Sequence, residues 1–284
     1  MNISYTAWEA YTECPKKFFL EHIKKAPPTT PSHDYYKLYG LIVQKFFEVF
    51  CNRWRFRTPY IFPEIIHEKL VVLWEDLLKT VTVDWDASYA VKQKDEILDE
   101  AYTDVCIIMD SLNQNYFLNS RSEVEITIRL KDSHSINGII DFVHTDYMAG
   151  NSVVIFDGKG TRTVGKNIDK NQLLFYALLY YLSTKILPST LGFFYYKLNV
   201  FSPLFFNQDV LNEFRIRLSA DIKAMTTCAE YVATPCAKSC RYCLYLTGCM
   251  EGQQAKSKRA RPSKLKELDK RGEEESGILE FGLD

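Results

Sequence analysis

The sequence lacks two features that would assign it to a class at once, a large net charge and a long apolar run. Lys and Arg number 35 against 36 Asp and Glu, so the formal net charge is -1. Without a global positive field, any argument for nucleic-acid binding must rest on local groups. No stretch reaches the roughly 18 apolar residues of a membrane-spanning helix. Trp8, Glu9 and Glu13 interrupt the N-terminus where a secretory signal would be apolar. We therefore expect a cytoplasmic protein without membrane contact.

Helical periodicity dominates the first 120 residues. Apolar residues recur at helical spacing in four segments, residues 4–23, 37–52, 64–80 and 92–118. In the first segment, Thr6-x-x-Glu9 is interpreted as an N-terminal capping box. Pro15, which follows Cys14, is expected to bend or break this helix.

The pattern then changes to short strands separated by turns. The elements expected there are strands at 122–130, 135–146 and 152–157, a helix at 169–186, an aromatic β-prone stretch at 190–200 and a helix at 207–231. A β-β-β-α-β core wrapped by N-terminal helices predicts an α/β domain with a small mixed sheet.

Two of the expected strands carry an aspartate near their C-terminal ends. Asp141 closes the segment 136–141, and Asp157 is followed by Gly158 and Lys159. Carboxylate oxygens suit Mg²⁺, and a bound metal activates water and neutralises charge on a phosphate. Side chains alternate along a strand, so Lys159 is expected on the same face as Asp157. The pattern favours a metal-dependent phosphodiesterase, although Asp-x-Lys also occurs in plain turns with a solvated lysine.

The helix that follows adds two polar side chains, Gln172 and Tyr176, four residues apart. Residues at that spacing lie on one helix face. Glutamine can bind a phosphate or orient water, and tyrosine can stack on a base or sugar. The alternative is a helix whose polar residues simply face solvent.

Four of the eight cysteines fall within fourteen residues, which in a cytoplasmic protein favours metal binding over disulfides. Three thiolates come from Cys240-x-x-Cys243-x5-Cys249, and a metal centre needs a fourth. Cys236 would complete a local loop of the kind that favours zinc, whereas Cys14 would bring a ligand from the other end of the chain. The remaining cysteines fit helical patterns as small buried apolar side chains: Cys51, Cys106 and Cys228.

Four motifs follow one another along the chain: an opening Ser4-Tyr5-Thr6-x4-Tyr11-x2-Cys14-Pro15-x2-Phe18, then Gly138-x-x-Asp141, Asp157-x-Lys159-Gly160 and Gln172-x3-Tyr176. Together they resemble the RecB-like branch of the PD-(D/E)XK nuclease superfamily, over roughly residues 2 to 251. The similarity is greatest to iron–sulfur members such as the CRISPR-associated exonucleases and the AddB-type repair nucleases.

The resemblance implies a restriction-endonuclease-like fold and a role for each motif. Asp141 and Asp157 become ligands of Mg²⁺ or Mn²⁺, Lys159 the catalytic lysine, and Gln172 and Tyr176 substrate-binding residues. The implied ligands of a four-iron, four-sulfur cluster are Cys14, Cys240, Cys243 and Cys249. Residues 1–252 would form one nuclease domain, with a helical part at about 1–120, the α/β core at about 121–231 and the cysteine segment at 232–252.

One position departs from the pattern of that branch. A metal-binding histidine is expected four residues after an early helical glycine, but Gly40 is followed at that distance by Gln44. The amide oxygen, or the carboxylate of Glu48 one turn further, would have to replace it. Glu123 and Glu125, on the preceding strand, are interpreted as surface charges.

The chain after Gly252 has few apolar residues and is predicted to form a disordered tail over 253–284. Its basic run, 256–266, would bind DNA in a salt-dependent way, and its hydrophobic-acidic end, 277–284, would dock on a partner protein. Other basic residues expected to contact phosphates are Lys16, Lys17, Lys24, Lys25, Arg162, Lys166, Lys170 and Lys185.

Three functions remain open on this sequence. The first is a metal-dependent deoxyribonuclease, an exonuclease on DNA ends or single strands in DNA repair or replication. The second is a non-catalytic DNA-binding or complex-assembly subunit on the same fold, which Gln44 favours. The third is a zinc-stabilised interaction module. No segment resembles a helicase motor, so any unwinding would come from a partner helicase, recombination or replication protein.

Overall fold

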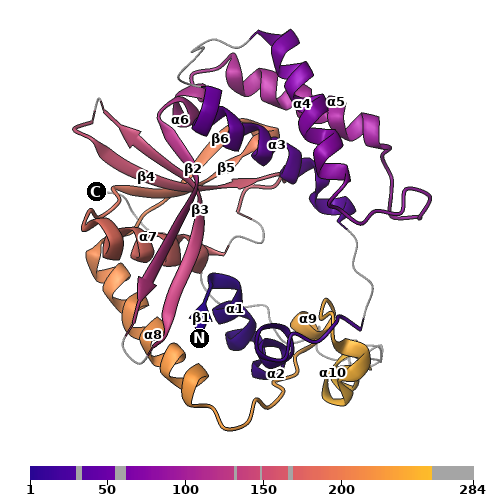
Figure 1. Ribbon diagram of the computed structural model, residues 1–284, viewed down its shortest axis with the longest axis vertical. Coiled ribbons are helices and arrows are strands. Elements are labelled where there is room, and N and C mark those ends of the chain that lie inside the picture. Colours follow the sequence, from indigo (N-terminus) through magenta and orange to yellow (C-terminus); the bar gives the residue numbers. More distant parts are fainter. Residues whose placement is uncertain (30–33, 55–61, 131–132, 148, 166–168, 258–284) are drawn as a thin grey trace, which may run out of the picture.

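A mixed six-stranded sheet lies between two layers of helices in the computed structural model (Figure 1). The structure describes residues 1–257 apart from 30–33, 55–61, 131–132, 148 and 166–168. The strands are β1 (Asn2–Ile3), β2 (Ser120–Arg129), β3 (Ser135–Asp146), β4 (Ser152–Lys159), β5 (Thr190–Tyr195) and β6 (Val200–Leu204). They follow the order β1-β3-β4-β5-β6, and β2 also pairs with β3. Only β1–β3 and β4–β5 are parallel pairs among these strands, which confirms the predicted α/β class.

One face of the sheet is covered by α1 (Tyr5–Glu13), α7 (Lys170–Thr184) and α8 (Gln208–Thr227). α7 is apolar almost all round, from Leu173 to Tyr180, because it packs on the sheet and on α8 at once. Trp8 of α1 joins this core, and its Nε1 donates a hydrogen bond to Asp221 of α8 at 2.8 Å.

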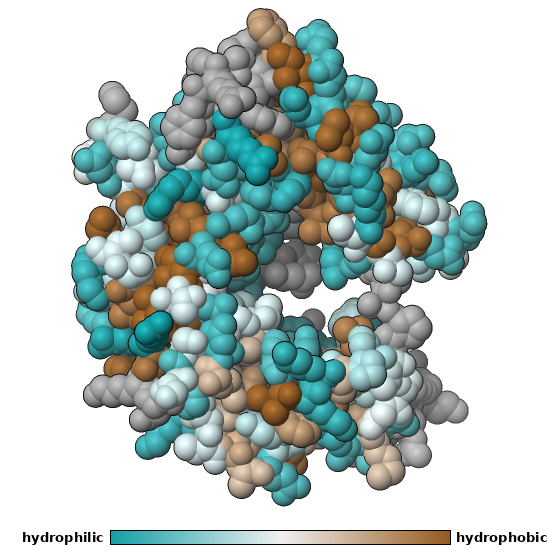
Figure 2. Space-filling model, in the orientation of Figure 1, coloured by the Kyte–Doolittle hydropathy of each residue, from teal (hydrophilic) through white to brown (hydrophobic). Residues whose placement is uncertain are grey.

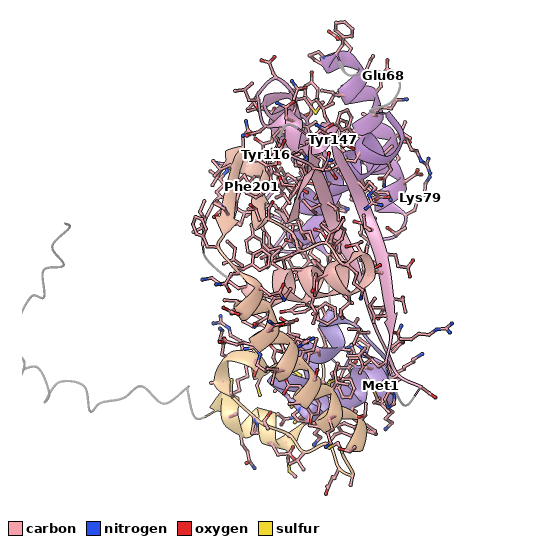
Figure 3. All side chains as sticks on the ribbon, turned by 90° about the vertical axis from the view of Figure 1, so that its left-hand side faces the viewer. Met1, Glu68, Lys79, Tyr116, Tyr147 and Phe201 are labelled. Atoms are coloured by element: carbon pink, nitrogen blue, oxygen red, sulfur yellow. The ribbon has the colours of Figure 1, made fainter. Side chains whose placement is uncertain are left out.

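The other face is covered by α3 (Leu38–Val49), α4 (Pro63–Leu78), α5 (Lys94–Met109) and α6 (Gln114–Leu118). A 3₁₀ turn (Tyr35–Lys37) precedes α3, and a π-helical turn (Phe50–Trp54) follows it. Aromatic rings fill this second core. Figure 3 shows Tyr116 of α6 beside Phe201 of β6, and their rings stack with centroids 4.7 Å apart.

The N-terminal helix is shorter than predicted and starts differently. Pro15 breaks it as expected, leaving α1, α2 (Pro15–Phe18) and a π-helical turn (Phe19–Ile23). The proposed capping box at Thr6 and Glu9 is wrong. The helix begins at Tyr5, so the capping residue is Ser4, whose hydroxyl accepts a hydrogen bond from Ala7 N at 3.2 Å.

Two predicted continuous elements are interrupted. The segment 92–118 forms α5 and α6 instead of one helix, because Asn113 in the turn between them donates hydrogen bonds to Asn199, 2.8 Å to its backbone oxygen. The stretch 190–200 forms β5, a 3₁₀ turn (Tyr196–Leu198) and the start of β6. Long-range contacts of this kind leave no periodic signal in the sequence.

The C-terminal segment lies against the N-terminal helices. It contains α9 (Ala237–Cys240), a 3₁₀ turn (Leu246–Gly248) and α10 (Met250–Ser257). Thr29 N donates to Leu244 O at 2.9 Å, and Thr234 Oγ1 donates to Glu13 O at 3.0 Å. α10 includes residues 253–257, so the predicted disordered tail starts too early, and residues 258–284 lie outside the described residues.

An opening separates the C-terminal segment from the α3–α5 layer. Figure 2 shows the surface hollowed between these two groups of helices.

None of the described helices is both long and apolar enough to cross a bilayer.

Candidate active site

The two aspartates lie where β3 and β4 separate. β4 pairs with β3 only as far as Phe156, opposite Phe142, and its last three residues pair with β5 alone. Asp157 is the first residue beyond this fork on β4, and Asp141 directly precedes Phe142 on β3. Gly158 N donates a hydrogen bond to Asp141 Oδ2 at 3.4 Å, so the side chain of Asp141 reaches across the fork to β4.

The alternation of side chains along β3 breaks at Asp141. Ile140 belongs to the core under α7, Phe142 to the opposite core, and Val143 to the α7 side again. Across from Asp141 on β2, Glu123 has a left-handed backbone with φ of 54°. A non-glycine residue in that conformation is strained, and such residues cluster at functional sites. Because both strands are irregular at this point, the side chains of Asp141 and Glu123 depart from the regular alternation between the two faces of the sheet.

Two glycines let the flanking helices approach the fork. A Cβ on Gly138 would lie 2.7 Å from Leu179 Cδ1 of α7, and a Cβ on Gly160 would lie 3.1 Å from Gly40 Cα of α3. Because these positions lack side chains, both helices pack closely on the sheet. The glycines of the motifs Gly138-x-x-Asp141 and Asp157-x-Lys159-Gly160 are therefore explained by helix packing as well as by the chemistry of the neighbouring acid or lysine.

The carboxyl groups at the fork lie in a buried, acidic environment. Asp157 is 3% exposed, and Lys159 Nζ lies 2.5 Å from its Oδ2. Burial, followed by the charges of Asp157 and Glu123, raises the pKa of Asp141 well above its ordinary value. Burial also raises the pKa of Asp157, although Lys159 opposes that rise. Lys159 alone does not balance the charges of Asp141 and Asp157, and Glu123 adds to them, so the site favours an additional positive charge.

α7 contributes its predicted pair to the same place. Asp169 caps the helix and also accepts a hydrogen bond from the hydroxyl of Tyr5 on α1. Gln172 Nε2 donates to Tyr176 Oη at 3.2 Å, which confirms that the two share a face. After burial, the Asp141 carboxylate is the next cause of the raised pKa of Tyr176. Side chains of β3, β4 and α7 thus gather at one place: Asp141, Asp157, Lys159, Gln172 and Tyr176.

A hydrogen-bonded pair lies where the resemblance leads us to expect a histidine. Gln44 Nε2 donates to Glu123 Oε1 at 3.1 Å, and burial raises the pKa of Glu123. The interpretation of Glu123 as a surface charge is therefore wrong, whereas Glu125 is exposed as predicted. Glu48 forms an ion pair with Lys45 at 2.7 Å in the same cleft of about 470 Å³. Sequence alone could not separate Glu123 from Glu125, because only the backbone conformation distinguishes them.

The donor set fits a hard divalent cation. Over residues 1–257, with the gaps given above, no three acidic, histidine or cysteine side chains stand close enough to form a ready metal site. Mg²⁺ is commonly bound through one or two carboxylates, with waters completing its shell. Asp141 and Asp157 meet that requirement, and their under-compensated charge is what a cation would balance.

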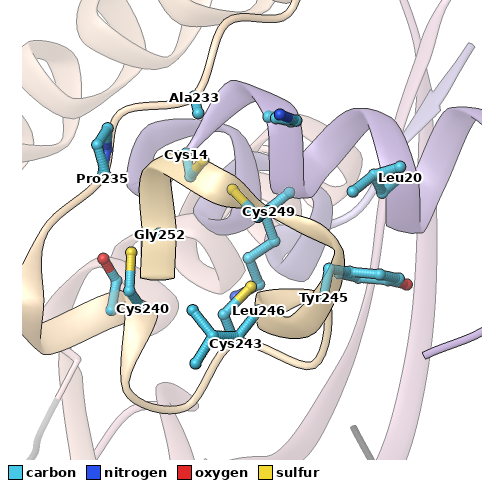
Figure 4. Close-up of a pocket in the computed structure, with 13 residues that line it drawn as sticks. Cys14, Leu20, Ala233, Pro235, Cys240, Cys243, Tyr245, Leu246, Cys249 and Gly252 are labelled. Atoms are coloured by element: carbon cyan, nitrogen blue, oxygen red, sulfur yellow. The ribbon is translucent and has the colours of Figure 1, made fainter. Parts of the chain in front are cut away.

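Four cysteines from the two ends of the described chain line one cavity (Figure 4). One lies at the α1–α2 junction and three in the C-terminal segment: Cys14, Cys240, Cys243 and Cys249. Cys236 is not part of the lining, and its Sγ lies 3.1 Å from Ser239 Oγ at the exposed start of α9. All of these cysteines are free thiols. Four thiolates suit either zinc or an iron–sulfur cluster, although the sulfurs do not stand at ligand geometry in the described chain.

The remaining cysteines behave differently from one another. Cys51 is buried as predicted, and its Sγ donates to Phe117 O at 3.2 Å. Cys106 and Cys228 are only partly buried, because each lies near the exposed side or the end of its helix. None of the three lines the cavity of the four clustered thiols.

Several basic residues expected to contact DNA are engaged within the protein. Three form ion pairs: Lys16 with Glu251, Lys17 with Glu13 and Arg162 with Glu100. Lys185 donates to Leu182 O at the end of α7. The side chains of Lys24, Lys25 and Lys170 are exposed. Lys166 lies outside the described residues.

Comparison with known proteins places this geometry in a family. A family model described as the PD-(D/E)XK nuclease superfamily matches residues 2–250. A putative exonuclease from Eubacterium rectale superposes with a TM-score of 0.52 at 11% identity, over 85% of this chain and 87% of that one. The structure of SSO0001 gives a TM-score of 0.36 at 12% identity, over 88% and 85%, which supports no inference. No curated protein matches significantly. The family match and the first superposition agree with the predicted restriction-endonuclease-like fold.

Proposed function

This chain belongs to the PD-(D/E)XK nuclease superfamily, and on that basis we propose that it is a Mg²⁺- or Mn²⁺-dependent deoxyribonuclease of the RecB-like branch. The observation that carries the proposal is the meeting of the buried Asp157, the partly buried Asp141 and a lysine at the β3–β4 fork, with Lys159 Nζ 2.5 Å from Asp157 Oδ2. A plain turn with a solvated lysine would not bury Asp157 or leave Lys159 only 29% exposed.

Each residue at the fork has a role in phosphodiester hydrolysis. Asp141 and Asp157 would hold the cation, which when bound would acidify a water molecule and neutralise charge on the phosphate. The ammonium of Lys159, held over the Phe193 ring at 5.2 Å, stabilises the charge that develops during attack. Gln172 uses an amide N–H on Tyr176, which leaves its amide oxygen to orient the substrate or a water.

We propose an exonuclease that acts on DNA ends or single strands. The name of the Eubacterium rectale protein agrees with this choice, and the shared fold is the extent of that likeness. Linear single-stranded, blunt and circular DNA distinguish the alternatives, because an exonuclease degrades the first two and spares covalently closed circles. Unwinding of longer duplexes would require a partner helicase or replication protein.

The proposal is tested by comparing two lysine variants of the purified protein on labelled DNA with Mg²⁺ or Mn²⁺. Lys159→Ala is expected to reduce the cleavage rate by about 10²–10³-fold, the usual cost of losing one preorganised electrostatic group. Lys79→Ala, at an exposed ion pair with Asp76 at the end of α4, is the matched control and should keep full activity. Equal rates for the two variants would remove the mechanism. Binding without cleavage in wild type would favour the non-catalytic DNA-binding subunit.

We further propose that Cys14, Cys240, Cys243 and Cys249 hold a four-iron, four-sulfur cluster with a structural role. These four thiols share a cavity, while Cys236 faces solvent, which argues against a local zinc loop completed by Cys236. A cluster joining residue 14 to residue 249 closes a loop of most of the described chain. Closing so long a loop restricts the unfolded chain and stabilises the fold.

A pair of cysteine variants tests the cluster. After anaerobic purification, Cys14→Ala is expected to lose the cluster's visible absorption and its bound iron and sulfide, and to unfold at a lower temperature. Cys236→Ala should retain all of them. A colourless wild-type protein with stoichiometric zinc would support the zinc alternative, and equal iron content in both variants would exclude Cys14 as a ligand.

A further inference from the structure

A buried hydroxyl beside the fork has no role in the mechanism above. Tyr196 is 1% exposed, and its Oη has no hydrogen-bond partner within the part of the chain that the structure describes. Buried polar groups are nearly always paired, because an unpaired one loses its hydration without compensation. A hydroxyl buried this deeply, without a partner among the described residues, calls for an explanation in the chemistry of the neighbouring site.

The hydroxyl of Tyr196 occupies the space that a side chain at Gly158 would fill, between Asp157 and Lys159 on β4. A Cβ on Gly158 would lie only 1.9 Å from Tyr196 Oη and 2.4 Å from its Cζ. Gly158 is the middle residue of Asp157-Gly158-Lys159, so glycine is required there to admit the hydroxyl. Gly158 N itself donates to Asp141 Oδ2 at 3.4 Å. The tyrosine thus reaches the fork from the α3 side, opposite Gln172 and α7.

The ring of Tyr196 holds the hydroxyl in this position. The ring stacks on Phe47 of α3, with centroids 5.8 Å apart, and contacts Phe194 of β5 at 6.0 Å. Its backbone begins the 3₁₀ turn that directly follows β5. After burial, the next causes of the raised pKa of Tyr196 are the charges of Asp141 and Asp157, which lie near its hydroxyl.

We propose that Tyr196 is a positioning residue whose hydroxyl, unpaired among the described residues, donates a hydrogen bond to the Asp141 carboxylate when a divalent cation binds there, and so fixes the orientation of that carboxylate. The inference rests on the proposed function, because it assigns a partner to one of the two carboxylates that would hold the metal. Groups that orient metal ligands from outside the ligand set typically contribute 10–100-fold to metal affinity. Gly158 and Tyr196 then act together, because the absence of a side chain at Gly158 leaves space for the hydroxyl of Tyr196.

Tyr196→Phe tests this role because it removes only the hydroxyl and keeps the stacked ring. The affinity for Mn²⁺ is obtained from the concentration of free Mn²⁺, which is measured by electron paramagnetic resonance. Thermal stability is measured in EDTA, so neither measurement depends on catalysis. We expect Mn²⁺ to bind about 10-fold more weakly. The metal-free variant should be as stable as wild type or more stable, since an unpaired buried hydroxyl is lost.

Tyr231→Phe is the matched control. Its hydroxyl donates to Met225 O at 2.9 Å near the end of α8, so this variant should lose stability and keep its Mn²⁺ affinity. Unchanged Mn²⁺ affinity in Tyr196→Phe would overturn the inference, and so would a fall in metal-free stability that parallels the fall in affinity. Wild-type protein that binds no Mn²⁺, or binds it as well after Asp157→Asn, would overturn the proposed function together with this inference.

Discussion

Two clusters of charge, one at the β3–β4 fork and one just beyond the ends of β4 and β5, differ in how they are balanced. At the fork, Asp141 and Asp157 share one lysine in the neighbourhood of Glu123, and burial raises the pKa of both aspartates. Near it, one carboxylate is surrounded by three cations. Glu100 of α5 lies 2.8 Å from Lys197, 2.9 Å from Lys92 and 3.1 Å from Arg162.

The difference distinguishes a structural cluster from one that we propose to be functional. Glu100 links α5 to the segments after β4 and β5, and Lys197 also lies 3.9 Å above the Tyr39 ring. Burial alone would raise the pKa of Glu100, but hydrogen bonds from Lys197 and Lys92 outweigh it and lower the pKa. This network is complete without a ligand. The fork is not, since its acids lack the charge that would stabilise them in ionised form.

The largest expected effect comes from removing charge at the fork. Asp157→Asn should reduce DNA cleavage by about 10²–10³-fold, because a preorganised charged group at the reacting phosphate is lost. The same variant should not lower the melting temperature in EDTA, since a poorly compensated buried charge is removed. Cleavage assays and thermal unfolding of one preparation measure both. A stable variant with normal activity would mean that the fork is not the active site.

The matched change in the other cluster should have the opposite profile. Glu100→Gln is expected to lower stability by about 1 kcal/mol, because three cations lose their shared partner at a partly solvated site. In a chain of this size that corresponds to a fall of about 2–4 °C in melting temperature. DNA cleavage at a temperature well below unfolding should stay within about threefold of wild type. A loss of activity like that of Asp157→Asn would place Glu100 in the catalytic machinery and break the comparison.

The smallest effect is a difference in the pH dependence of stability, measured by urea unfolding without metal. Asp141 has a raised pKa in the folded state, so its contribution is present below its unfolded pKa of about 3.9 and is lost as pH rises through the folded pKa. Glu100 has a lowered pKa, so its contribution is present above about 4.3 and is lost as pH falls. Asp141→Asn should flatten the decline toward neutral pH, and Glu100→Gln should flatten the decline toward acid. The same slope change in both variants would contradict the assignment.

Much of the core was predictable because each element carries its own signal. Alternation located β2 and the strand and turn pattern located β3, both within two residues of their bounds, and helical periodicity located α7 and α8. The misses have a common cause. β1, the break between α5 and α6 and the 3₁₀ turn at Tyr196 depend on contacts with residues distant in sequence, such as Asn113 with Asn199.

The residues of the candidate site likewise differ in whether a local sequence pattern or a long-range contact places them. Asp157 and Lys159 were predictable because a strand-end acid and an alternating lysine are local patterns. Asp141 was predicted to end a strand, and that is wrong: it lies in the middle of β3 (Ser135–Asp146), and its side chain reaches β4 only because the two strands part there. Glu123 was not, because its left-handed backbone and its bond to Gln44 arise only when α3 packs beside β2. Tyr196 lies in a run of four aromatic residues, Phe193 to Tyr196, and nothing in that run marks the one whose hydroxyl is unpaired.

The amino-acid sequence by itself determined which groups are available and on which local elements they lie, since period, capping and strand ends depend on near neighbours. Tertiary structure alone decided where β3 and β4 part and which acids face each other there. The physical reason is that burial and charge balance belong to the space between elements. A carboxylate has no raised pKa, and a hydroxyl no missing partner, until the chain has folded around it.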